Sequence, residues 1–154
     1  MLLHGSCAAS EGPSGLGGVL VLGPPGSGKS DLVLRLMQRG WRLVADDQVE
    51  LEPGGMARAP AALAGLLEVR GVGIFQGLPH GPAPLCLAVE LAPQAAVPRL
   101  PSPRRYTPPE GAPPGFSLPL LALHPFEASA PAKIELALAA ATAGLSQRAG
   151  AFAA

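Results

Sequence analysis

The chain has 154 residues, of which 48% are hydrophobic and 14% charged, as is typical of one globular domain spanning residues 1–154 with a modest core. The formal net charge is zero and no basic block occurs, which argues against nucleic acid as a partner. Two cysteines are too few for a disulfide framework. No apolar run is long enough to cross a membrane and the N-terminus does not resemble a signal peptide, so we expect a cytoplasmic protein.

The N-terminal segment predicts a short strand at Leu2 and Leu3, followed by a turn. His4 lies so close to the chain end that it is either a frayed terminal residue or part of a site, and position alone favours the former. Residues 8–17 are small and polar, and they predict a loop.

A glycine-rich loop between a strand and a helix is the central feature of the sequence. An apolar run at residues 18–22 predicts a buried strand, and residues 31–39 predict a helix that ends before Gly40. The loop between them, here called the glycine loop, fits G-x-x-x-x-G-K-[ST] at every fixed position through Gly23, Pro24, Pro25, Gly26, Ser27, Gly28, Lys29 and Ser30. The chain has only one other lysine, Lys133, so the lysine of the motif is not a product of composition.

The spacing of this motif suits the binding of a nucleoside triphosphate. Glycines let the backbone approach phosphate oxygens, and successive N–H groups and the positive end of the following helix then face the anion. Lys29 can reach the outer phosphates, and the Ser30 hydroxyl can bind a magnesium ion. The sequence therefore predicts a site for ATP and Mg²⁺.

An acidic pair follows the next predicted strand, which covers residues 43–45. Asp46 and Asp47 stand at the end of that strand, where ligands bind in open α/β sheets. Such a pair is more often a solvated turn, but one short helix joins this strand to the glycine loop and brings the two strand ends together. We therefore expect a functional pair, and spacing alone leaves open which member acts as a base.

The middle of the chain predicts a hairpin, a helix and a strand. Pro53–Gly55 is a turn signal within the hairpin, and residues 59–67 predict a helix. In residues 67–74 the charges of Glu68 and Arg70 alternate with apolar residues, so both point to the same side of a strand. They form a solvated ion pair on an edge strand, unless Glu68 belongs to a site.

The C-terminal half predicts two strands and a final helix. The strands cover residues 85–91 and 120–123, and they are separated by a loop at 98–119 that contains eight prolines. The last helix runs from about Ser129 to 142, and residues 143–154 are expected to form a frayed tail.

Four features occur in an order that resembles the catalytic domain of HPr kinase/phosphorylase. They are His4-Gly5, the glycine loop, the run 43–47 (Leu-Val-Ala-Asp-Asp) and the run 67–74 (Leu-Glu-Val-Arg-Gly-Val-Gly-Ile). The family phosphorylates a serine of the phosphocarrier protein HPr with ATP. It also removes the phosphoryl group from that serine with inorganic phosphate. The resemblance covers roughly residues 4–142 and implies an α/β P-loop kinase domain with a central sheet flanked by helices. It also implies the short, catalytic-domain-only form and, as in the family, a hexamer.

The resemblance implies roles for individual residues. By this resemblance the catalytic residues are Asp47, with Asp46 beside it, His4, Lys29 and Arg99. Magnesium binding falls to Ser30 and Glu68. Arg99, in Val97-Pro98-Arg99-Leu100, would match a later arginine of the family, next to a loop that varies among its members.

Two departures and two rival functions accompany this interpretation. The family usually has an acidic or small residue, then serine, where this loop has Pro24 and Pro25, and residues 76–84 lack the basic side chains common in the family. The rivals are a P-loop kinase of a small metabolite and a non-catalytic module that senses ATP. The presence of Asp47 and Glu68 argues against the second rival, because a pure binder needs no base.

Overall fold

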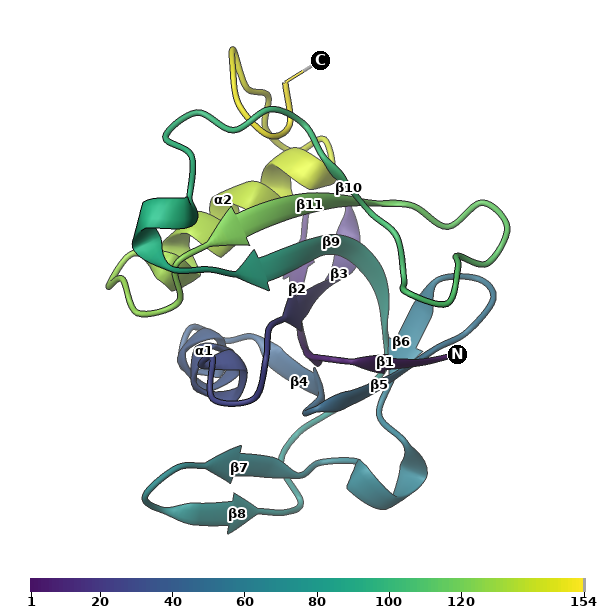
Figure 1. Cartoon of the computed structure of the whole chain (residues 1–154). Helices are drawn as coiled ribbons and strands as arrows, with labels where there is room; N and C mark the ends of the chain where they lie inside the picture. The colour runs from purple at the N-terminus through teal and green to yellow at the C-terminus, as the bar shows by residue number, and fades with distance from the viewer. Residues whose placement is uncertain (154) are drawn as a thin grey trace.

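The computed structural model describes residues 1–153 and has a mixed α/β fold built on a nine-stranded sheet (Figure 1). The strands of this sheet are β1 (Leu2–His4), β2 (Ser6–Gly12), β3 (Gly15–Leu22), β4 (Arg42–Ala45), β5 (Gln48–Leu51), β6 (Met56–Arg58), β9 (Ala83–Leu91), β10 (Arg105–Tyr106) and β11 (Leu118–Leu123). Their order is β1-β5-β6-β9-β3-β2-β4, and β11 adds to β9 and pairs with β10. The α/β class and the central sheet predicted from the sequence are confirmed.

Strand β9 organises the sheet, because it is long enough to pair with three other strands. One edge runs parallel to β3, whereas the other edge pairs first with β6 and then, parallel, with β11. The remaining pairs are antiparallel. Because β3, β9 and β11 are parallel, their carboxyl ends share one edge of the sheet, and the segments that follow them meet there.

The side chains of β3 alternate between two hydrophobic clusters, one on each face of the sheet. Val19 and Val21 lie in one hydrophobic cluster and Leu20, between them, lies in a second. The first cluster includes the apolar faces of helices α1 (Lys29–Met37) and α2 (Ala130–Ala141), whereas strands and the proline-rich loop supply the second. The chain of strand β3 therefore reads as a continuous apolar run, as expected for a strand with both faces covered.

A separate hairpin, β7 (Leu67–Val69) and β8 (Gly73–Phe75), lies beside α1 and away from the main sheet (Figure 1). Residues 67–74 were expected to form one strand, and this expectation is wrong. The chain reverses within 70–72, where Gly71 has φ +81°, and Gly73 follows with φ +146°, conformations that L-residues rarely adopt.

Three other expectations differ from the structure. Residues 8–17 are not a loop: most of them belong to the hairpin of β2 and β3, in which Ala8 and Ala9 are buried. The helix predicted at 59–67 is a single 3-10 turn, η1 (Ala61–Leu63). The tail is not frayed through 153, because Ala151 is buried and Phe152 packs on the first cluster.

The remaining expected elements are confirmed. The hairpin around Pro53–Gly55 joins β5 and β6, and the proline-rich segment is a loop interrupted by β10. A second 3-10 turn, η2 (Gln94–Ala96), follows β9. In residues 1–153, no helix has both the length and the apolar character needed to cross a bilayer.

Candidate functional site

The glycine loop connects β3 to α1 in a conformation that requires its glycines. Gly26 and Gly28 have φ +80° and +99°, in the region that L-residues avoid. Helix α1 begins at Lys29, so the first-turn N–H groups, which have no intrahelical partner, point into the loop. Lys29 Nζ donates to the carbonyl oxygens of Gly23 at 2.7 Å and Pro24 at 3.1 Å. The lysine therefore lies over the loop rather than extending into solvent.

The interior of the loop fits a group that carries hydrogen-bond acceptors. The Ser27 hydroxyl is buried there and has no hydrogen-bond partner among the described residues. A Cβ on Gly23 would lie only 2.5 Å from Ser27 Oγ, so no other residue fits at position 23 without a shift. Backbone donors, an ammonium group and an unpaired hydroxyl are the chemistry that a phosphate needs.

Asp46 links the glycine loop to two other segments. It directly follows β4, and its side chain is almost fully buried. Oδ1 accepts hydrogen bonds from Ser30 Oγ at 2.7 Å and from Ser6 Oγ at 2.9 Å, and Oδ2 accepts one from the Glu68 N–H at 3.3 Å. The carboxylate thus holds the loop, β2 and β7 together.

No lysine or arginine pairs with Asp46 in the described part of the chain. A buried carboxylate without a cationic partner is costly unless a metal or several donors compensate it. Within residues 1–153, no group of three or more histidine, cysteine, aspartate or glutamate side chains is arranged to hold a metal on its own. Mg²⁺ commonly binds one or two carboxylates and completes its shell with water and phosphate oxygens, so Ser30 and Glu68 fit its chemistry, with Asp46 hydrogen-bonded behind Ser30.

Asp47 has a different environment from its neighbour. It is exposed, and its φ of +64° is in the left-handed region. Its backbone N–H donates to Ser6 Oγ at 3.3 Å, and its carbonyl accepts from the Gly5 N–H at 3.1 Å, so the backbone is fixed while the carboxylate is free to face the cavity. Adjacent residues of a regular strand face opposite sides of the sheet. Asp47 lies in a left-handed turn instead, yet the two side chains still differ, because Asp46 is buried and Asp47 lines the cavity.

A cavity of about 450 Å³ opens beside the glycine loop. Its lining combines residues of the loop and α1, Asp47, the β7–β8 hairpin and the segment after β11. These are Pro25, Gly26, Gly28, Lys29, Ser30, Asp31, Leu34, Asp47, Glu68, Val69, Arg70 and Phe126. The structure therefore brings together Lys29, Ser30, Asp47 and Glu68, which the sequence predicted to share a site.

His4 and Arg99 do not line this cavity. His4 ends the edge strand β1, opposite Gln48, with an exposed side chain. Arg99 is exposed in the loop after η2. The proposed catalytic roles of both residues are thus unsupported by the cavity itself, and they remain predictions from the resemblance.

Arg70 and Phe126 are lining residues whose possible roles the sequence did not reveal. Arg70 was considered only as half of an ion pair with Glu68, but no such pair occurs among the ion pairs of the described residues. A Cβ on Gly26 would lie 3.9 Å from Arg70 Nη2, so the guanidinium faces the glycine loop. Phe126 follows β11, and no local motif marks it.

Comparison with known proteins agrees with this geometry. Residues 4–77 match the HPr Serine kinase C-terminal domain family. Over 62 residues, or 38% of the chain, it is 49% identical to the HPr kinase/phosphorylase of Levilactobacillus brevis and 52% identical to that of Brevibacillus brevis. These alignments span only 20% of each relative's length.

A solved structure extends the likeness beyond the motifs. The HPr(Ser) kinase/phosphatase of Coxiella burnetii superposes with a TM-score of 0.70 and 25% identity, covering 88% of this chain and 87% of that one. Motif order, matched residues and fold agree. The chain is therefore similar to the C-terminal domain of HPr kinase/phosphorylase, as its sequence predicted.

Proposed function

We propose that this protein transfers the γ-phosphoryl group of ATP to a serine of the phosphocarrier protein HPr. We propose that it also catalyses the removal of that group by inorganic phosphate. The observation that carries this proposal is the 2.7 Å hydrogen bond between Ser30 and Asp46, which couples the glycine loop to the acidic end of β4 beside Asp47. A module that only bound ATP would need Lys29 and Ser30 but no base, whereas here the exposed Asp47 lines the cavity beside them.

The residues divide the work of phosphoryl transfer, in which charge spreads over the oxygens of the group in flight. The loop N–H groups and Lys29 hold the phosphates, and Arg70 adds a second cation from the hairpin. Ser30 and Glu68 supply oxygen ligands for Mg²⁺, and Asp46 orients the Ser30 hydroxyl. When bound, Mg²⁺ neutralises phosphate charge.

Asp47 is the proposed proton acceptor, because it is the exposed carboxylate of the pair and lines the cavity. The serine oxygen of HPr attacks the γ-phosphorus, the bond to the ADP oxygen breaks, and the serine proton moves to Asp47. In the reverse process an oxygen of inorganic phosphate attacks the phosphoserine, Asp47 returns the proton to the leaving serine oxygen, and pyrophosphate forms.

Incubation with γ-labelled ATP, Mg²⁺ and HPr tests this function, with HPr lacking its acceptor serine as the control. We expect label on HPr only when the serine is present, and its loss on addition of inorganic phosphate. Binding of ATP without transfer would identify a sensing module. Transfer to a small acceptor but not to HPr would identify a metabolite kinase. Light scattering of the purified protein tests the predicted hexamer.

A further inference from the structure

We propose that Phe126 is the stacking surface for the base of the bound nucleotide and that Arg35 positions it. This proposal deepens the function above and rests on it, since it concerns the same cavity. Phe126 lies in the segment between β11 and α2, which follows the carboxyl end of a parallel strand at the same edge of the sheet as the glycine loop. It is an exposed phenylalanine, with 64% of its surface accessible, where burial would be the usual state.

Phe126 lies directly against the glycine loop. A Cβ on Gly28 would meet its ring at 3.0 Å, and the ring and Leu34 line the same cavity as Lys29. Phe126 is the sole aromatic side chain among the described lining residues. A triphosphate held by the loop carries its nucleoside within the same cavity, and an aromatic ring is the side chain on which bases stack whatever their identity.

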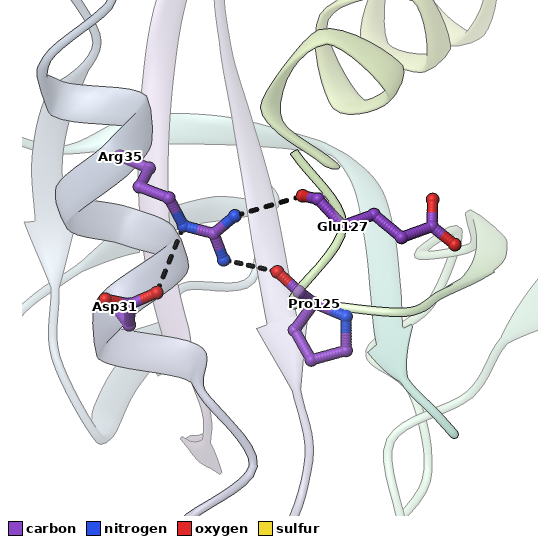
Figure 2. Close-up of polar contacts among 4 residues, drawn as sticks. All are labelled: Asp31, Arg35, Pro125 and Glu127. Carbon is purple, nitrogen blue, oxygen red and sulfur yellow. Dashed lines mark hydrogen bonds and ion pairs between the residues drawn. The ribbon is translucent and has the colours of Figure 1, made fainter. Parts of the chain in front are cut away.

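Arg35 holds the backbone on both sides of Phe126. Figure 2 shows its guanidinium between three partners. Nη2 donates to the carbonyl of Pro125, Nη1 donates to the carbonyl of Glu127 at 3.4 Å, and Nε donates to Asp31 Oδ2 at 3.0 Å. Since Arg35 of α1 holds a carbonyl of each residue next to Phe126, the backbone before and after the ring is fixed against the helix while the ring itself stays exposed.

The ring also has lateral support. His124 makes an edge-to-face contact with Phe126, with ring centroids 5.8 Å apart and an interplanar angle of 79°. His124 Nδ1 lies 3.1 Å from the carbonyl oxygen of Ala92, in the segment after β9. Fixed on two sides, the ring is a preorganised platform, which reduces the entropy lost when a ligand stacks on it.

Calorimetric titration with two probes, ATP and inorganic tripolyphosphate, separates base binding from phosphate binding. We expect Phe126→Ala to weaken ATP binding by roughly 5- to 150-fold, the range of one base–aromatic stack, and to leave tripolyphosphate binding unchanged. Phe126→Tyr should restore ATP binding. Leu136→Ala, which truncates a similarly exposed side chain of α2 outside the cavity, is the matched control and should change neither affinity.

Arg35 is tested by its coupling to Phe126. Arg35→Ala should weaken ATP but not tripolyphosphate, and the double variant with Phe126→Ala should bind ATP little worse than Phe126→Ala alone. Circular dichroism checks that each variant is folded. Equal loss for both probes, or an unchanged ATP affinity in Phe126→Ala, would overturn the stacking role while leaving the kinase proposal intact. Wild-type protein that binds neither probe would overturn both.

Discussion

The cavity has two walls that are built in opposite ways. One wall is anchored in the main sheet: Ser30 and Asp46 are joined by a hydrogen bond, and Asp46 is almost entirely buried. The other wall is the β7–β8 hairpin, a two-stranded sheet in which Glu68 and Arg70 are exposed. Its strand β7 is tied to the core by buried Leu67 and by the hydrogen bond from the Glu68 N–H to Asp46, whereas β8 is exposed along its whole length. The first wall therefore offers buried, fixed groups for a bound phosphate, and the hairpin offers exposed charges.

The largest loss of activity is expected when the lysine beside the anchored wall, Lys29, is removed. We expect Lys29→Ala to abolish transfer and to weaken ATP binding, because a charge-assisted hydrogen bond of about 1.5–3 kcal/mol is lost. Lys133→Ala is the control, since this second lysine pairs with Glu127 and does not line the cavity. ATP titration and HPr phosphorylation measure both effects. Normal kinase activity in Lys29→Ala would rule out the proposed nucleotide site.

The two adjacent aspartates at the end of β4 provide a sharper comparison, because Asp46 is buried and Asp47 is exposed. Asp47→Asn should keep ATP bound and the fold intact, since asparagine tolerates the left-handed region, but should slow transfer about 10²- to 10⁴-fold. Phosphoserine removal should slow in parallel, since both directions share one transition state. Asp46→Asn should instead lower the free energy of unfolding by about 1.5–3 kcal/mol through its three hydrogen bonds.

Rates and denaturant melts on both variants distinguish these outcomes. An Asp47 variant that transfers normally would refute its role as base. Equal loss of rate in the two variants with no loss of stability would mean that the pair acts jointly.

On the hairpin wall, Glu68→Gln should raise the Mg²⁺ concentration needed for half-maximal activity, because a hard cation prefers a charged carboxylate. Glu110→Gln, an exposed glutamate outside the cavity, is the control. The measurement is activity against Mg²⁺ concentration for both variants and wild type. Curves that coincide would leave Glu68 as an ordinary exposed charge of the hairpin.

The same contrast explains how much the sequence could predict. The glycine loop and the end of β4 were predictable because each is a local pattern. The loop has a fixed spacing of residues, and β4 is an apolar run followed by two aspartates. The reversal at 70–72 was missed because alternation looks alike in one long strand and in a hairpin, and only Gly71 and Gly73 mark the turn. Strand β2 was missed because its side chains are small.

Phe126 shows the limit of local patterns. It reaches the cavity through the parallel pairing of β11 with β9 and through the contacts of Arg35, which comes some ninety residues earlier in the chain. None of these contacts leaves a signal near residue 126. The tail was misjudged for the same reason, since Phe152 packs on a cluster assembled from distant segments.

The smallest expected effect concerns a support of the anchored wall outside the cavity. Glu135 of α2 accepts hydrogen bonds from Arg39 and, at 3.1 Å, from the indole N–H of buried Trp41, and so fixes the connection between α1 and β4. The hydrogen bond from Arg39, helped by that from Trp41, lowers the pKa of Glu135. Because the folded pKa lies below the unfolded one, this stabilisation is present above the ordinary glutamate pKa of about 4.3 and is lost as the pH falls through the lower folded value.

Glu135→Gln should therefore reduce the acid dependence of stability below about pH 5. Its effect at pH 7 should be no more than about 1 kcal/mol, because the pair is partly exposed, and transfer should be unaffected. Thermal melts of both proteins from pH 3 to 7 measure this, and parallel curves would show that Glu135 contributes nothing to the support of this wall.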